Sequence, residues 1–244
     1  MNRSENSNHE PTEFFHYYGQ IQWVSDVFLN KRVFFPHPSK FNDPFDPPKY
    51  HSTFENVGVF TLTPNAKSIL MWSHYANSHY GLCIGFENDG KNPCSGAAKI
   101  VYKKEDEFYF SQIPENDPLS SLKIKANFWK YENEWRIIET GNGENKKGFY
   151  RQIPGRIIRI ILGCRFINHT HESKRNYIEF QNVFKEAFNQ YFNVIWSNRN
   201  RNDTDWDEKP PRANQNEVLL QQVVPMPDKY GLRLRTLAKL RWKE

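Results

Sequence analysis

The chain has 244 residues, of which 38% are hydrophobic and 16% aromatic, and these side chains are sufficient for a single buried core. No apolar run approaches about 18 residues and the first residues are polar, so we expect neither membrane insertion nor secretion. The three cysteines form no CxxC pair, which favours the reducing cytoplasm. The net charge of +5 comes largely from residues 228–244, where six basic residues, all within 229–243, face two acidic ones. This tail predicts either contact with nucleic acid or a solvated basic surface.

The first part of the chain predicts short elements followed by a proline-rich loop. Residues 1–12 are rich in Asn, Ser and Glu and indicate a disordered lead. A strand is expected at 14–17, a helix at about 20–29 from its three-to-four-residue apolar spacing, and a second strand at 33–35. Five prolines in residues 36–48 then predict a rigid, irregular loop, because proline lacks an amide donor and restricts the preceding residue.

The rest of the chain alternates strands with a few helices. The expected elements are a strand at 56–63, a helix at 66–78, a strand at 81–87, a helix or loop that runs into a strand at 125–140, a strand at 155–166, a long helix at 171–192, and strands at 193–198 and 217–227. This order predicts an α+β fold with a split, mixed or antiparallel β-sheet core. We expect one catalytic-type domain over 13–198, followed at 199–244 by a polar flap, a last strand and the basic C-terminal tail.

The segment MWSHYANSHYGLCIGF, residues 71–86, concentrates aromatic and His side chains. If the helix extends over 68–78, Trp72, Tyr75 and His79 share one face. Such residues either pack in the core or line a pocket that stacks a planar ligand. The His and Cys spacings match no common zinc pattern, so no metal site is expected.

The stretch WKYENEWRII places charged residues at alternate positions. In a strand, Glu132, Glu134 and Arg136 share one face, while Trp135 and Ile137 share the other. The charged face is either a surface ion pair or the wall of a cleft, in which a carboxylate stabilises positive charge developing on the anomeric carbon of a sugar. Glu132, Glu134 and Arg136 are therefore the candidate catalytic residues.

Two smaller groups of polar side chains are candidates for the same cleft. In the strand FFHYYG, His16 alternates with Tyr17, so that the imidazole can face the cleft. The stretch FNDPFD supplies Asn42, Asp43 and Asp46, either as ligand contacts or as an Asx-type turn that satisfies its own backbone.

Four stretches, KRVFFPHPSKFNDPFD, MWSHYANSHYGLCIGF, FWKYENEWRII and IIRIILGCRF, together resemble in order and spacing a bacterial and phage family described as a domain of unknown function. The resemblance covers residues 14–198. A weaker resemblance links this pattern to ADP-ribosyltransferases, whose split α+β core uses a His or Arg on the first strand, a Tyr or Ser in the middle and a Glu on a late strand. His16, Tyr75 and Glu134 are the matching positions here, with Glu132 as the alternative for the last.

The second resemblance implies an ADP-ribosyltransferase-like fold and NAD as the donor substrate. It implies that His16 holds the ribose, that Tyr75 or a neighbour stacks the nicotinamide, and that Glu134 aids glycosidic cleavage. The other residues assigned to NAD binding are Tyr17, Asn42, Asp43, Trp72 and His79.

The same resemblance implies a toxin or phage-defence effector. The opening FHYYGQIQWVSDVFLNKRVFF is similar to that of the subgroup that modifies nucleic acids, so nucleic acid is one expected acceptor; a protein acceptor or an antitoxin is the other expected partner. Two functions of other classes stay open. One is a non-catalytic module that binds a nucleotide or nucleic acid, and the other is a hydrolase that cleaves NAD without an acceptor.

Overall fold

A computed structural model gives the fold of residues 10–43, 46, 54–104, 107, 117–141, 147–166, 171–188, 190, 215–226 and 230–243. Over these residues the chain is α+β, with four β-sheets and three α-helices, as the sequence predicts. Residues 1–9 of the lead expected at 1–12, the strand expected at 193–198 and residues 199–214 of the expected flap lie outside the described residues.

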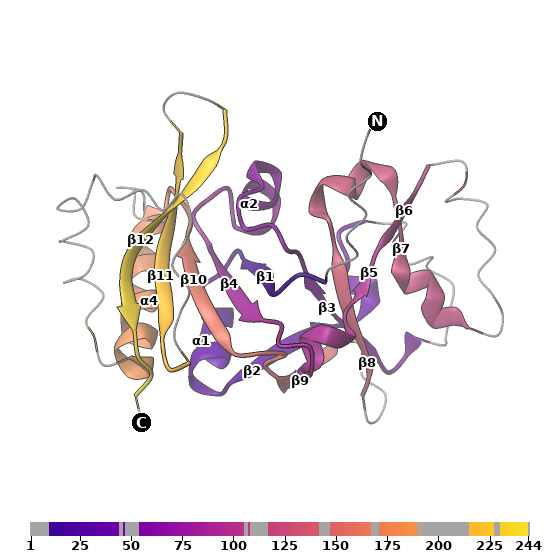
Figure 1. Cartoon of the computed structure of the whole chain (residues 1–244), viewed down its shortest axis with the longest axis horizontal. Coiled ribbons are helices and arrows are strands. Elements are labelled where there is room, and N and C mark those ends of the chain that lie inside the picture. The colour runs from indigo at the N-terminus through magenta and orange to yellow at the C-terminus, as the bar shows by residue number, and fades with distance from the viewer. Residues whose placement is uncertain are drawn as a thin grey trace, which may run out of the picture.

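The largest sheet has five strands in the order β1-β4-β10-β11-β12 (Figure 1). These strands are β1 (Glu13–Tyr18), β4 (Leu82–Glu87), β10 (Ile157–Leu162), β11 (Val218–Pro225) and β12 (Leu232–Leu240). The sheet is mixed, because β10 and β11 are parallel whereas the other neighbours are antiparallel.

The edge strand β12 lies within the segment expected to be a basic tail. That expectation is wrong over residues 232–240, because this segment pairs with β11 and buries Leu232 and Leu240 at its two ends. The last two strands therefore complete the sheet that begins with β1.

Three smaller sheets make up the other side of the molecule (Figure 1). The strands are β3 (Val57–Leu62), β8 (Trp135–Thr140) and β5 (Ala98–Lys99) in the first sheet, β2 (Arg32–Pro36) and β9 (Gly148–Gln152) in the second, and β6 (Val101–Lys103) and β7 (Ile124–Ala126) in the third. Phe15 of β1 and Thr63, just after β3, exchange backbone hydrogen bonds of 2.7 and 2.9 Å. This bridge joins the two halves of a split core at the place where the candidate residues gather.

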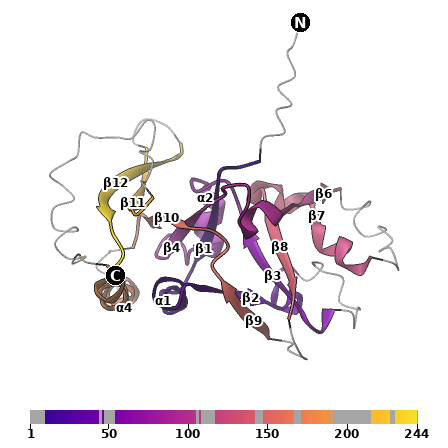
Figure 2. The same cartoon turned by 60° about the horizontal axis from the view of Figure 1, so that its bottom comes forward.

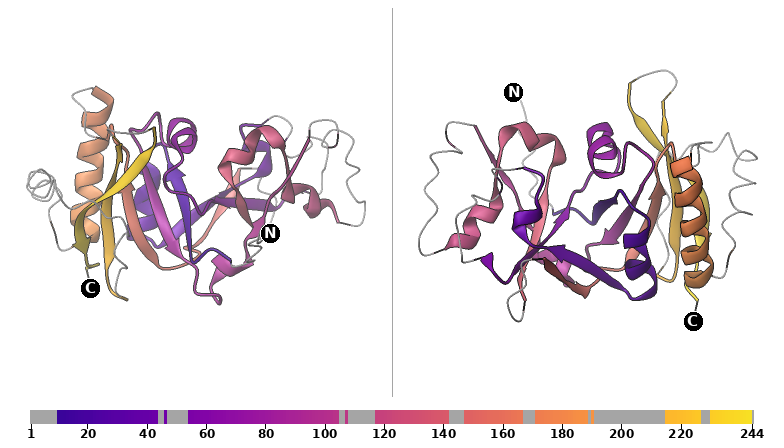
Figure 3. Two further views of the ribbon diagram at one scale, coloured as in Figure 1. Left: turned by 45° about the horizontal axis from the view of Figure 1, so that its top comes forward. Right: turned by 180° about the vertical axis from the view of Figure 1, so that it is seen from behind.

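Helices cover both faces of the five-stranded sheet. Helices α1 (Gln22–Leu29) and α4 (His171–Ala187) lie side by side on one face, and α2 (Ile69–Tyr75) packs on the other (Figures 2 and 3). Short 3-10 helices are η1 (Pro38–Lys40), η3 (Pro93–Gly96), η4 (Pro118–Lys123) and η5 (Asn127–Glu132). No helix in the described part of the chain is long and apolar enough to cross a membrane.

The alternation of side chains along each strand explains why the five-stranded sheet has a hydrophobic core on each of its two faces. In β10, Ile160 belongs to the same buried cluster as Phe28 of α1 and Phe184 of α4, whereas the next residue, Ile161, belongs to the cluster of Trp72 of α2. Successive residues of a strand point to opposite faces, so an apolar run such as this one is buried on both. The strong apolar strand expected within 155–166 is confirmed over Ile157–Leu162.

Candidate functional site

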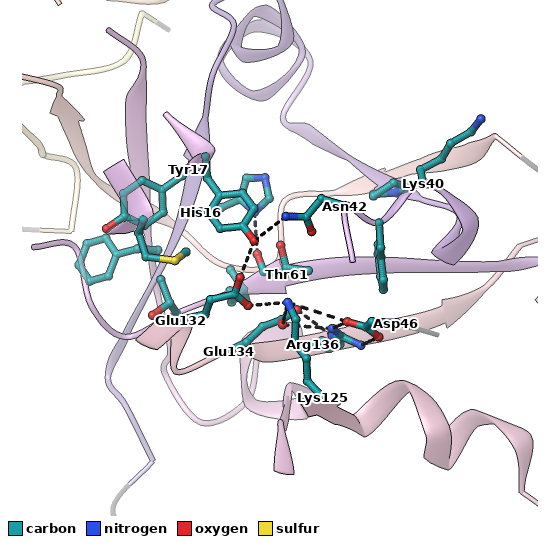
Figure 4. A pocket seen from close by; sticks show the side chains of 17 residues that line it. His16, Tyr17, Lys40, Asn42, Asp46, Thr61, Lys125, Glu132, Glu134 and Arg136 are labelled. Atoms are coloured by element: carbon teal, nitrogen blue, oxygen red, sulfur yellow. Dashed lines mark hydrogen bonds and ion pairs between the residues drawn. The ribbon is translucent and has the colours of Figure 1, made fainter. Parts of the chain in front are cut away.

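A cavity of about 230 Å³ opens where β1 and β3 meet. Its walls come from β1, the loop after η1, β3, α2, β7 and the junction of η5 with β8 (Figure 4). The polar and charged lining residues are His16, Tyr17, Lys40, Asn42, Asp46, Thr61, Thr63, Tyr75, Lys125, Glu132, Glu134 and Arg136. The cavity therefore brings together residues from nearly every candidate stretch of the sequence.

Lys125 lies at the centre of a buried group of charges. Its Nζ is 2.6 Å from the carboxylate of Glu132, 3.1 Å from that of Glu134 and 3.9 Å from that of Asp46 (Figure 4). All four side chains are almost completely buried. One ammonium group thus holds three carboxyl groups around the cavity.

Arg136 is the second cation of this group. Its Nε donates to Glu134 at 2.7 Å, and its guanidinium makes two hydrogen bonds to the Asp46 carboxylate, one of them 2.9 Å long. Nη1 also donates to the carbonyl of Leu122 at 2.8 Å, and the Phe41 ring lies 4.9 Å from the guanidinium carbon. Arg136 is 1% exposed, so this contact is not the surface ion pair that the sequence also allows.

Tyr75, the last residue of α2, connects the charged group to the proline-rich loop. Its hydroxyl donates a short hydrogen bond to Glu132 and accepts one of 3.1 Å from the Asn42 amide. Burial and the neighbouring Glu132 carboxylate raise the pKa of Tyr75, so the hydroxyl keeps its proton. Tyr75 lines the cavity, and its hydroxyl is held by Glu132.

The two glutamates have different acidities. Burial raises the pKa of Glu132 to about 7, against the opposing effect of Lys125. Burial acts in the same direction on Glu134, but Arg136 and Lys125 outweigh it and hold the pKa of that carboxyl at about 2. At neutral pH, Glu134 is ionised, whereas Glu132 can take up or release a proton.

Glu132, Glu134 and Arg136 do not lie on one strand. Glu132 ends η5, and Asn133 adopts a left-handed conformation with φ of 45°. Of the three candidates only Arg136 belongs to β8. The expectation that Glu132, Glu134 and Arg136 share a strand face is therefore wrong, although their side chains do meet in one cavity.

His16 lines the cavity as a neutral imidazole. Its Nδ1 lies 2.6 Å from the carbonyl of Thr61, and its ring stacks on Phe60 with centroids 4.4 Å apart. Because a carbonyl only accepts, Nδ1 carries the proton and Nε2 is left as an acceptor. Burial lowers the pKa of His16 to about 4, with the bond to Thr61 opposing it, which keeps the ring neutral at pH 7.

Two other residues assigned to ligand binding, Trp72 and His79, have structural roles. Trp72 is fully buried and donates from Nε1 to the carbonyl of Ala66 at 2.8 Å. His79 lies beyond the end of α2 with φ of 73°, so the prediction that it extends the helical face of Tyr75 is wrong. Its ring stacks over Trp72 and its Nε2 is 3.2 Å from Ser73 Oγ, and neither Trp72 nor His79 lines the cavity.

The remaining candidates differ in how directly they reach the cavity. Tyr17 lines it, but its hydroxyl donates to the carbonyl of Asn65 at 2.8 Å. Asn42 contacts Tyr75, whereas Asp43 is buried outside the lining, and its carbonyl accepts from the Asp46 amide at 3.1 Å. This is a backbone-to-backbone hydrogen bond, whereas an Asx-type turn uses the side-chain oxygen, so the Asx-type interpretation stays a prediction.

Lys125 was not a candidate from the sequence, and Asp46 was considered only as part of its loop. The signal for Lys125 is weak: it is a lysine between Ile124 and Ala126 in a three-residue strand. Its role depends on the contact with Glu132, which only the tertiary structure reveals.

A protein-family model described as "Protein of unknown function (DUF2971)" matches residues 71–137. The matched segment begins in α2, ends in β8 and includes Tyr75, Lys125, Glu132, Glu134 and Arg136. Searches of the curated proteins and of the solved structures found no match.

Proposed function

We propose that the chain is an ADP-ribosyltransferase-like enzyme that takes NAD as its donor. The observation that carries the proposal is the pair Glu132 and Glu134, two buried carboxyl groups of opposite pKa shift in one cavity. Enzymes that break glycosidic bonds commonly use two carboxyl groups with different pKa values, because one stays ionised while the other transfers a proton.

The charge balance of the cavity suits this donor. With Glu132 ionised, three carboxylates face the two cations Lys125 and Arg136, which leaves one net negative charge. The nicotinamide ring of NAD is a cation, and the ribose becomes positively charged as the bond to nicotinamide breaks. A preorganised negative site stabilises that charge more strongly than water does.

Each reacting group then has a defined role. The bond between ribose C1′ and the nicotinamide nitrogen breaks, and nicotinamide leaves as a neutral molecule with the bonding electrons. Glu134 stabilises the cationic ribose, and an acceptor hydroxyl attacks C1′ while the ionised Glu132 takes its proton. The Tyr75 ring packs on nicotinamide, and His16, with Nε2 as an acceptor, binds a ribose hydroxyl.

The biological part of the proposal is a cytoplasmic toxin or phage-defence effector. It is supported by the resemblance to ADP-ribosyltransferases and by Cys83 and Cys94, which are buried and unpaired as expected in a reducing compartment. The partner is then an acceptor, either nucleic acid or protein, or an antitoxin that blocks the cavity.

The test measures both products of NAD cleavage, nicotinamide and ADP-ribose. The purified chain is incubated with NAD labelled in its adenine, alone and with single-stranded DNA, RNA or bacterial lysate, and nicotinamide and the label are then measured. We expect nicotinamide release together with label attached to a macromolecule. Nicotinamide and free ADP-ribose in every mixture would replace the proposal with an NAD hydrolase, and binding of NAD without release would replace it with a non-catalytic module.

A further inference from the structure

The 3-10 helix η5 carries a row of aromatic side chains beside the cavity. Phe128 is 71% exposed, which is unusual for so large an apolar side chain. Trp129 and Tyr131 are half-buried, with ring centroids 6.1 Å apart, and Tyr131 continues the row to His74 of α2 through a 2.8 Å hydrogen bond. We call Phe128, Trp129, Lys130 and Tyr131 the η5 surface.

The η5 surface is attached directly to the candidate site. Glu132 is the last residue of η5, and Lys125 lies just before its start. The Nζ of Lys125, which binds Glu132, also lies 4.8 Å from the centre of the Trp129 ring. A molecule that rests on these rings is therefore next to the carboxyl group that is proposed to accept its proton.

Positive charge surrounds these rings. Residues 98–104 and 117–132, which form β5, β6, β7, η4 and η5, contain six lysines and two acidic residues, Asp117 and Glu132. Of these lysines, Lys99, Lys104, Lys123 and Lys130 are exposed. Exposed aromatic rings interleaved with lysines fit a partner that has both flat apolar faces and negative charges.

We infer that the η5 surface binds single-stranded nucleic acid. Its unstacked bases pack on Phe128 and Trp129, and its phosphates lie near Lys104, Lys123 and Lys130. The inference that single-stranded nucleic acid is the acceptor rests on the proposed transfer reaction. The inference that the η5 surface binds it does not depend on NAD.

Charge alone would place the nucleic-acid site at the basic C-terminal residues and not on the η5 surface. The basic residues of 233–243 lie on and around β12, at the opposite end of the molecule from β6 and β7 (Figures 1 and 2). There, Arg235 donates to Gln222 at 2.8 Å and Lys239 lies 3.8 Å from Glu217, so part of the charge is used within the sheet.

The test measures binding of fluorescently labelled oligothymidylate and oligouridylate by anisotropy, with no NAD present. We expect both single strands to bind and Phe128→Ala to weaken binding about tenfold, since stacking on one aromatic side chain contributes roughly that factor. Phe128→Trp restores the ring and should restore the affinity. Because Phe128 is so exposed, its removal leaves the fold intact, which a thermal melt checks.

A matched pair of lysines separates the two surfaces. Lys130→Gln should lower the slope of log Kd against log salt concentration by about 0.7, whereas Lys239→Gln on β12 should leave it unchanged. Equal binding by Phe128→Ala and the parent chain, or a salt slope that falls only with Lys239→Gln, would overturn the inference. So would equal competition by polyglutamate, because that polyanion has no bases. Since NAD is absent throughout, these results are independent of the proposed reaction.

Discussion

The ammonium group of Lys125 lies 2.6 Å from the carboxylate of Glu132, and both side chains are buried in the wall of the cavity. The contact connects β7 to the end of η5 and opposes the rise in the pKa of Glu132 that burial causes. Without such a cation, a carboxyl group in this position stays protonated at neutral pH. Lys125 therefore sets the pH range in which Glu132 can act as a base.

The first prediction concerns the pH dependence of nicotinamide release. Glu132 must be ionised to accept the acceptor proton, and its pKa is about 7, so kcat/KM should rise as the pH increases through about 7. Glu134 is ionised over this whole range and adds no second rise. In Glu132→Gln the residual rate should be low and should lack this rise. A parent profile that is flat between pH 6 and about 8.5 would contradict the role of Glu132.

Replacing Lys125 should move that profile. Lys125→Met removes the charge that holds the pKa of Glu132 down, so the midpoint of the rise should shift to higher pH. The matched control is Lys123→Met, two residues earlier and exposed, which should leave the midpoint in place. A shift in the opposite direction, or the same shift in both variants, would count against the contact between Lys125 and Glu132.

The pair of Asp46 and Arg136 should be important for stability. Asp46→Asn leaves the guanidinium with less compensation in a buried site and should lower the free energy of unfolding by roughly 3 kcal/mol. The control is Glu139→Gln, which breaks the half-exposed pair of Glu139 with Arg151 and should cost less than about 1 kcal/mol. Urea titration measures both values. Equal losses would mean that the buried pair contributes no more than the surface one.

The turn before β4 depends on a residue without a side chain. A Cβ on Gly81 would lie 2.1 Å from the carbonyl oxygen of Tyr18 and 3.0 Å from that of Ala76, and neither backbone group can move freely. We expect Gly81→Ala to lower the free energy of unfolding by more than about 2 kcal/mol. Gly96→Ala is the control, because no atom lies within 4 Å of its Cβ position, and its effect should stay within about 0.5 kcal/mol.

Local patterns predict most of the strands. The aromatic run of β1 and the apolar run of β10 both specify strands, and the spacing of Val24, Val27 and Phe28 specifies the buried face of α1. In contrast, the basic charge of 232–240 predicts a tail, whereas the alternation of leucine and arginine in the same segment is typical of a strand. Periodicity was the better guide there because the backbone pairing with β11 determines the structure.

The site was predicted only in part. His16, Asn42, Tyr75, Glu132, Glu134 and Arg136 do gather in one cavity, as the patterns of polar residues suggest. The contact of Asp46 with Arg136 spans 90 positions, and local spacing carries no information about such a pair. His79 shows the opposite error, because the helix that was to carry it ends at Tyr75.

The most direct test is the initial rate of nicotinamide release from NAD by the parent chain, Glu134→Gln and Glu139→Gln. Glu134 belongs to the cavity, whereas Glu139 lies on β8 and pairs with Arg151 outside the cavity. We predict a loss of at least about 100-fold in Glu134→Gln, with NAD binding retained in calorimetry, and a rate within about twofold of the parent in Glu139→Gln. No release by the parent chain, or a Glu134→Gln rate equal to that of the parent, would contradict the assignment of this cavity as an NAD-cleaving site.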